Sequence, residues 1–243
     1  MINLSRIRLE LKKVSFEKIA IIIAISCITP FLFTLFVLYT QSNGISTLAG
    51  AFLVGNLVGP WSSLLLGMLV IVLCYVVTEE EQRKNILKLY RPYKRYWYAW
   101  IGGKALVIMG ILLGVFITNT ILSAIALKII STMISSGETF YDLFLLYLYK
   151  FSKAYVFALP CVFFQLLLAV WIKKPVLPVV LGLLLLILGI PVANLSNTYF
   201  IPYSYPILSQ KPSISMPSLI FATLLIIVFS SLLINSVLSN NKK

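Results

Sequence analysis

Six apolar stretches, each about as long as a membrane-spanning helix, constrain this chain more than any other feature. A bilayer core about 30 Å thick requires roughly 20 apolar residues per helix. The stretches cover residues 19–39, 51–77, 105–127, 155–172, 176–192 and 219–238. Charged residues make up only 11% of the 243 residues, whereas about 25% is usual in soluble domains. We therefore predict an all-α polytopic membrane protein with six transmembrane helices, in which residues 1–243 form one domain.

The distribution of lysine and arginine predicts the orientation of these helices. Basic residues of short loops stay on the cytoplasmic side of a membrane. If both chain ends are cytoplasmic, sixteen of the twenty basic residues fall on that side. The four on the other side are Lys128, Lys150, Lys153 and Lys211. We therefore interpret the net charge of +13 as a topology signal and predict no binding to nucleic acid.

Residues 1–18 form a basic lead to the first apolar stretch. Leu4, Ile7, Leu11 and Val14 recur at helical spacing among arginines and lysines, which favours a helix lying in the inner membrane interface. A solvated basic tail is the other interpretation. A cleaved signal peptide has a shorter lead and an apolar region of about 7–15 residues, so we expect the first apolar stretch to remain in the mature chain.

Several kinds of chemistry lack their usual residues. The sequence contains no histidine, which excludes Ser-His and Cys-His dyads and histidine-ligated metals. None of its seven carboxylates falls in the middle of an apolar stretch, as proton-coupled transport usually requires. The three cysteines show no metal-binding or redox spacing, and no phosphate-binding loop is present. We expect no catalytic residue, no metal and no cofactor in this chain, and any ATP must bind a partner.

The connection between the second and third stretches, residues 79–104, holds ten of the 27 charged residues. Acidic residues open it, a short helix is predicted up to Tyr90, and Pro92 breaks that helix before an aromatic return to the membrane. This pattern suits a cytoplasmic docking element, although a solvated loop with interfacial aromatic residues has a similar composition. The candidate docking residues are Glu79, Arg83, Lys84, Asn85, Ile86, Tyr90, Pro92 and Arg95.

A second set of polar and aromatic residues is a candidate for substrate contact. Asn119 and Gln165 lie within apolar stretches, where an amide lines a substrate surface or makes an interhelical hydrogen bond. Glu138 and Asp142 attract a cationic ligand or belong to an ordinary solvated loop. Residues 194–217 contain several prolines and cannot form one regular helix. The aromatic candidates in this outer segment, which we expect to face the membrane interface, are Tyr199, Phe200, Tyr203 and Tyr205.

The whole arrangement resembles the permeases of type-2 ATP-binding-cassette exporters. The matching features are the six stretches, the basic lead, and a connection with Asn85, Pro92, Arg95 and Lys104. Residues 158–182, ALPCVFFQLLLAVWIKKPVLPVVLG, and residues 197–208, NTYFIPYSYPIL, are similar to the permeases that give lantibiotic producers self-immunity. The polar residue that usually follows the glutamine is replaced here by leucines.

The resemblance implies a function and a set of partners. Residues 79–104 would include a coupling helix that fits a cleft on an ATPase subunit, and residues 194–217 would dip into the outer leaflet. Two ATPase subunits, which bind ATP and Mg²⁺, and a second permease, the same or related, would complete an exporter in the bacterial plasma membrane. Its substrate would be an amphipathic antimicrobial peptide. The alternatives are export of a self-made toxin or surfactant-like peptide, and a membrane sensor or scaffold that transports nothing.

Overall fold

The computed structural model describes residues 16–40, 50–83, 94–133, 139–172, 174–194 and 201–211, together with Ile220 and Leu224. Throughout these ranges the secondary structure is helical, without a strand, which confirms the predicted all-α class. The elements are α2 (Phe16–Thr40), α3 (Gly50–Pro60), the π-helix η2 (Trp61–Leu65), α4 (Leu66–Arg83), α6 (Lys94–Met133), α7 (Phe140–Trp171), α8 (Val176–Asn194), the 3₁₀-helix η3 (Pro202–Ser204) and α9 (Tyr205–Leu208).

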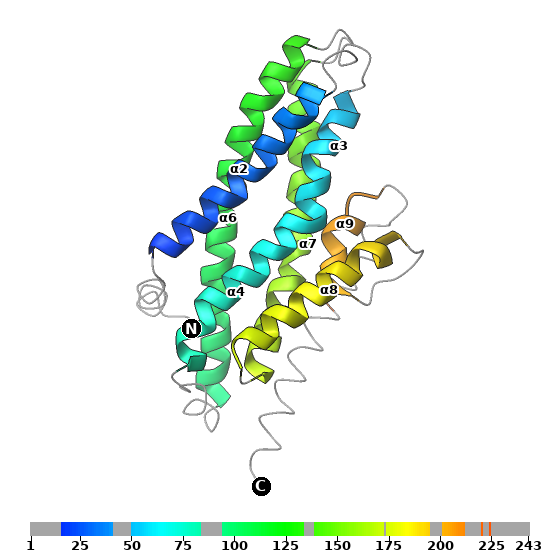
Figure 1. Ribbon diagram of the computed structural model, residues 1–243. Helices are drawn as coiled ribbons and strands as arrows, with labels where there is room; N and C mark the ends of the chain where they lie inside the picture. The colour runs from blue at the N-terminus through cyan, green and yellow to red at the C-terminus, as the bar shows by residue number, and fades with distance from the viewer. Residues whose placement is uncertain are drawn as a thin grey trace.

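The helices form an elongated bundle in which α6 and α7 run antiparallel over most of its length (Figure 1). Helix α7 packs against both α4 and α6, while α2 covers α6 and α8 covers α4. Apolar side chains at helical spacing fill the centre, among them Leu66, Ile71, Ile108 and Leu166, all of which are fully buried. Helices α3, α4, α6 and α7 therefore contribute most of the core.

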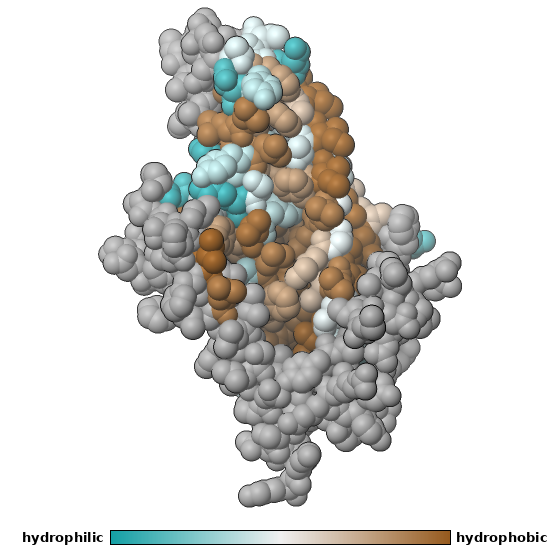
Figure 2. Space-filling model, turned by 180° about the vertical axis from the view of Figure 1, so that it is seen from behind, coloured by the Kyte–Doolittle hydropathy of each residue, from teal (hydrophilic) through white to brown (hydrophobic). Residues whose placement is uncertain are grey.

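Four described helices are long and apolar enough to cross a membrane: Leu57–Glu79, Trp100–Ile129, Phe140–Ala169 and Val176–Ala193. Large apolar side chains such as Ile25, Leu113 and Leu184 point outward, and Figure 2 shows hydrophobic side chains over much of the described part of one face. In water such a surface would be unfavourable, but lipid covers it readily. These observations show a membrane protein.

Two of the six predicted spans are not tested by these four helices. The first coincides with α2, whose described apolar part, Ile19–Thr29, is shorter than a membrane span. The sixth, at residues 219–238, lies outside the described residues except for Ile220 and Leu224. The interfacial helix predicted for residues 1–18 also lies almost entirely outside them. The count of six stays a prediction.

The helices that contain the third and fourth predicted spans extend beyond the apolar stretches. Helix α6 runs from Lys94 to Met133, and α7 begins at Phe140 rather than near residue 155. The side chains of Thr139 and Asp142 form a capping box that starts α7 early. A 40-residue helix is about 60 Å long, which exceeds the hydrocarbon thickness. Charged residues of both helices can therefore lie beyond the bilayer core without interrupting the helix.

The second span contains a local irregularity at the place where Gly55, Gly59 and Pro60 weaken it. Pro60 lacks a main-chain N–H, and the chain widens into the π-helix η2 directly after it. The hydroxyls of Ser62 and Ser63 donate to the carbonyls of Gly59 and Pro60, at 3.1 and 3.3 Å. Local side chains thus satisfy backbone groups that the regular helix would pair.

Candidate functional site

A buried group of charged and aromatic side chains joins the ends of α4 and α6 that flank residues 84–93. The ammonium of Lys104 lies 3.3 Å from one carboxylate oxygen of Glu81, and it donates a 2.7 Å hydrogen bond to the carbonyl of Val77. The indole N–H of Trp100 donates to the other carboxylate oxygen of Glu81. Lys104 also lies 5.7 Å from the centre of the Trp100 ring. We refer to Val77, Glu81, Trp100 and Lys104 as the α4–α6 charge cluster.

Helical spacing explains why these side chains meet. Val77 and Glu81 are four residues apart on α4, and Trp100 and Lys104 are four apart on α6, so each pair shares one helix face. Glu81 is 4% exposed and Lys104 is 1% exposed. Burying a charge is costly unless an opposite charge and hydrogen bonds compensate for it. In this cluster both carboxylate oxygens and the ammonium have partners.

The charge cluster links the two helices that flank residues 84–93. Its contacts hold the last turns of α4 beside the early turns of α6, at one end of the bundle (Figure 1). Both helices then continue into the core, where they pack against α7. A force on the segment would therefore reach two core helices together.

The structure describes only part of the predicted docking set. Glu79 is half-buried on α4, Arg83 is the last residue of that helix, and Arg95 is the second residue of α6. The side chains of Arg83 and Arg95 are not described. The remaining candidates lie outside the described residues: Lys84, Asn85, Ile86, Tyr90 and Pro92.

Sequence reasoning missed Glu81 and Trp100 as members of a site. It named Glu79 as a docking candidate and did not single out Glu81, which is paired with Lys104. A signal was present, since Val70, Cys74, Val77 and Glu81 continue one helical stripe, and all four are buried. Extending the apolar stripe into the acidic run would have selected Glu81.

Gln165 makes interhelical hydrogen bonds, as one of its two interpretations predicted. Its amide N–H donates a 2.9 Å hydrogen bond to the carbonyl of Pro178 on α8, and its amide oxygen accepts a hydrogen bond from the hydroxyl of Tyr203. A Cβ at Gly182 would lie only 2.6 Å from that amide oxygen. Glycine therefore lets the α8 backbone approach Gln165, which joins α7 to α8 and η3.

The expectation that Tyr203 and Tyr205 face the membrane interface is wrong. Tyr203 is 1% exposed and Tyr205 is 0% exposed, because η3 and α9 pack against α7 and α8. In this buried position the Tyr203 hydroxyl donates a hydrogen bond to Gln165. At the membrane interface it would not reach that side chain. Tyr199 and Phe200 lie outside the described residues.

Asn119 is buried on α6, close to two other polar side chains. It is 2% exposed, and its amide nitrogen lacks a hydrogen-bond partner in the described part of the chain. The same holds for the indole nitrogen of Trp61 and the hydroxyl of Tyr155, although Tyr155 lies near both Trp61 and Asn119. This burial removes Asn119 from the outer surface of the bundle.

Cysteines and acids do not assemble into a metal centre in the described ranges. Cys27, Cys74 and Cys161 are free thiols and are buried. The thiol of Cys161 donates to the carbonyl of Pro202 at 3.1 Å and so packs η3 onto α7. No group of three metal-ligating side chains occurs among these residues.

Comparison with known proteins identifies the family. A model of the ABC-2 family transporter proteins matches residues 6–189, most of the chain, including the charge cluster and the segment between its helices. The chain belongs to the ABC-2 transporter family. Searches of curated proteins and of solved structures found no match. Membership makes this protein the membrane subunit of an ATP-binding-cassette exporter, which pairs with an ATPase subunit.

We expect the Gln165 contacts to stabilise this ABC-2 subunit. Replacing Tyr203 by Phe removes the donor and leaves a buried amide oxygen without its partner, which costs about 1–3 kcal/mol. Thermal unfolding of the purified subunit should therefore occur at a lower temperature. Tyr149→Phe is the matched control, because Tyr149 is an exposed tyrosine on the same helix that Gln165 occupies. Equal unfolding temperatures for the two variants would contradict the assigned hydrogen bond.

Proposed function

We propose that this ABC-2 subunit works in an exporter that expels amphipathic antimicrobial peptides from the membrane and protects a lantibiotic-producing cell from its own product. The α4–α6 charge cluster is the observation that carries the coupling part of the proposal. It holds the two ends of the segment 84–93 together in a buried, compensated ion pair. A segment held in this way is suited to receive a push from an ATPase.

The proposed complex contains two permeases, the same or related, and two ATPase subunits that bind ATP and Mg²⁺. Both chain ends and the segment 84–93 face the cytoplasm of a bacterial cell, as the distribution of basic residues predicts. Glu79, Arg83, Lys84, Asn85, Ile86, Tyr90, Pro92 and Arg95 form the docking surface. No ATP-binding residue is assigned to the permease itself.

The coupling step follows from the way the helices are joined. Closure of the ATPase subunits moves the segment 84–93, and the charge cluster transfers that movement to α4 and α6. These helices pack on α7, so a change in their tilt changes the surface that α6 and α7 present to lipid. Packed helices switch between discrete arrangements rather than deforming continuously.

The peptide substrate is supported by the resemblance of residues 158–182 and 197–208 to self-immunity permeases and by the extensive apolar surface of the described helices. An amphipathic peptide partitions into the membrane interface, where such a surface is accessible to it. Because Tyr203 and Tyr205 are buried, Tyr199 and Phe200 remain as the proposed aromatic contacts in the outer segment.

A survival assay tests the substrate. Cells that make the complete transporter with the parent permease should tolerate a several-fold higher lantibiotic concentration than cells whose ATPase cannot hydrolyse ATP. Tyr199→Ala together with Phe200→Ala should reduce that protection without reducing the amount of complex in the membrane. If the parent complex protects against no lantibiotic or related cationic peptide, self-immunity fails and export of the cell's own toxin or surfactant-like peptide becomes the leading function.

A further inference from the structure

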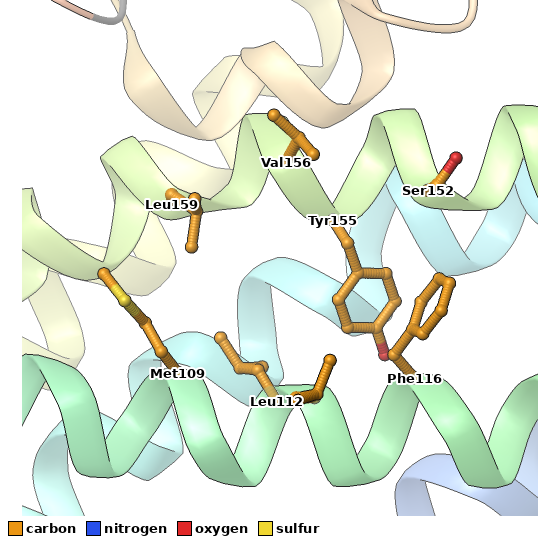
Figure 3. Close-up of a pocket in the computed structure, with 8 residues that line it drawn as sticks. Met109, Leu112, Phe116, Ser152, Tyr155, Val156 and Leu159 are labelled. Carbon is orange, nitrogen blue, oxygen red and sulfur yellow. The ribbon is translucent and has the colours of Figure 1, made fainter.

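An apolar groove of about 260 Å³ lies on the bundle surface between α6 and α7 (Figure 3). Met109, Leu112 and Leu113 form the α6 side, and Tyr155, Val156 and Leu159 form the α7 side. Leu113 is 60% exposed and Val156 is 56% exposed, so the groove opens outward. Phe116 and Ser152 lie at one end of it.

The groove is lined almost entirely by apolar side chains, and the hydroxyl of Ser152, at one end, donates to the carbonyl of Tyr149 on its own helix. Met109 and Leu159 mark the apolar end, whereas Ser152 lies at the end nearer the α6–α7 connection. From Met109 to Phe116 the groove follows seven residues of α6, about 10 Å at the rise of an α-helix. An amphiphile with its apolar part along the groove toward Met109 and its polar part toward Lys153 and the α6–α7 connection would match this arrangement.

One basic side chain, that of Lys153, lies on α7 next to the Ser152 end of the groove. Lys153 follows Ser152, and its ammonium lies 4.5 Å from the centre of the Tyr149 ring, one turn closer to the α6–α7 connection. Lys153 forms no ion pair with any other described residue. The side-chain amide of Gln210 donates a 2.9 Å hydrogen bond to the main-chain carbonyl of Lys150. This contact places the residues that follow α9 beside this part of α7. Among the described residues, the positive charge of Lys153 is therefore paired with no carboxylate.

The shape of the α6–α7 groove and the charge of the nearby lysine together indicate which ligand fits it. A membrane-facing groove with an apolar floor suits an acyl chain, and lysine beside an aromatic ring is typical of the level of lipid headgroups. A lysine near the membrane surface attracts anionic lipid. We propose that the α6–α7 groove binds one acyl chain of an anionic phospholipid, whose phosphate is held by Lys153 on the side of the α6–α7 connection. This lipid site is independent of the substrate that the exporter carries.

Photo-crosslinking of lipids to the purified permease–ATPase complex tests the site. The probe is phosphatidylglycerol with a diazirine in the middle of one acyl chain, and phosphatidylcholine with the same chain is the comparison. The residues that become labelled are mapped by mass spectrometry. We expect phosphatidylglycerol to label the groove at Met109, Leu112 or Leu159 more strongly than phosphatidylcholine does.

Three variants separate headgroup binding from chain binding. Lys153→Gln should lower labelling of the groove by phosphatidylglycerol about fivefold, the loss expected for one lysine at an anionic surface, and leave labelling by phosphatidylcholine unchanged. Val156→Trp should fill the groove and reduce labelling by both lipids. Because Val156 is exposed, the larger ring does not disturb the core. Lys128→Gln, at an exposed lysine beside Phe140, should change neither.

Three results would overturn the proposal. Equal labelling by the two lipids, together with no effect of Lys153→Gln, would show that the groove selects no headgroup. Labelling that Val156→Trp leaves unchanged would place the acyl chain elsewhere. Displacement of phosphatidylglycerol by a cationic amphipathic peptide, but not by excess unlabelled phosphatidylglycerol, would assign the groove to a transported peptide instead. Competition by unlabelled phosphatidylglycerol and not by inorganic phosphate is the supporting outcome.

Discussion

Replacing Glu81 by Gln is expected to destabilise the protein strongly, because Lys104 would keep its buried charge and lose the carboxylate that lies 3.3 Å from it. Removing one partner of a buried ion pair costs about 3–5 kcal/mol. The main-chain carbonyl of Val77 would remain as a partner of the ammonium, but it carries no net charge to replace the carboxylate. We therefore expect a sharp fall in the yield of folded permease and in its thermal unfolding temperature.

A double-mutant cycle distinguishes the ion pair from the individual side chains. Lys104→Met alone should be as harmful as Glu81→Gln, because it leaves a buried carboxylate. The double variant should be more stable than the sum of the two single effects predicts, since neither charge then remains unpaired. Glu17→Gln is the control, an exposed acid on α2. Additive effects in the double variant would show that Glu81 and Lys104 are not coupled.

Reversing Arg83 and Lys84 to Glu is expected to uncouple the exporter. Arg83 ends α4 and Lys84 begins the segment that we propose docks on the ATPase. Two acids at these positions change the charge of the docking surface by four units while leaving the buried cluster intact. We expect normal membrane insertion, weaker assembly with the ATPase and loss of most peptide resistance.

The matched control for this charge reversal lies at the C-terminus. Lys242→Glu with Lys243→Glu makes the same change in charge at residues for which we propose no contact with the ATPase. This control variant should retain assembly and resistance. The docking proposal would be abandoned if the Arg83 and Lys84 variant formed as much complex as the parent and protected cells equally well.

The architecture was largely predictable, because the membrane imposes a simple rule on sequence. Long apolar stretches predicted helices that the structure shows at α4, α6, α7 and α8. The helix ends were less predictable, since charged residues such as Lys128 and Lys150 interrupt an apolar stretch without ending a helix. The length of an apolar stretch reflects the thickness of the hydrocarbon core, whereas the helix that crosses this core can continue beyond it on either side.

The details of the sites depended on contacts between distant residues. Three consecutive acids follow the second span. The buried stripe of α4 singles out Glu81 among them, but only its packing against α6 shows that its partner is Lys104. Tyr203 looked suited to the membrane interface because it is aromatic and lies beside proline. Its burial depends on Gln165, 38 residues earlier, and on close backbone packing, where a Cβ at Gly189 would lie 3.3 Å from the main-chain nitrogen of Ser204. Local patterns do not contain such information.

Crosslinking from residue 88 tests the central claim most directly, namely that the segment between α4 and α6 docks on an ATPase. A photoreactive amino acid would replace Lys88 in cells that make the complete transporter, and mass spectrometry would identify every adduct. The same amino acid at Glu138, on the predicted opposite side of the membrane, is the control. We predict an adduct between position 88 and an ATP-binding-cassette ATPase, and none with that ATPase from position 138. An adduct from position 88 to a signalling kinase, or to the ATPase from position 138 alone, would contradict this account.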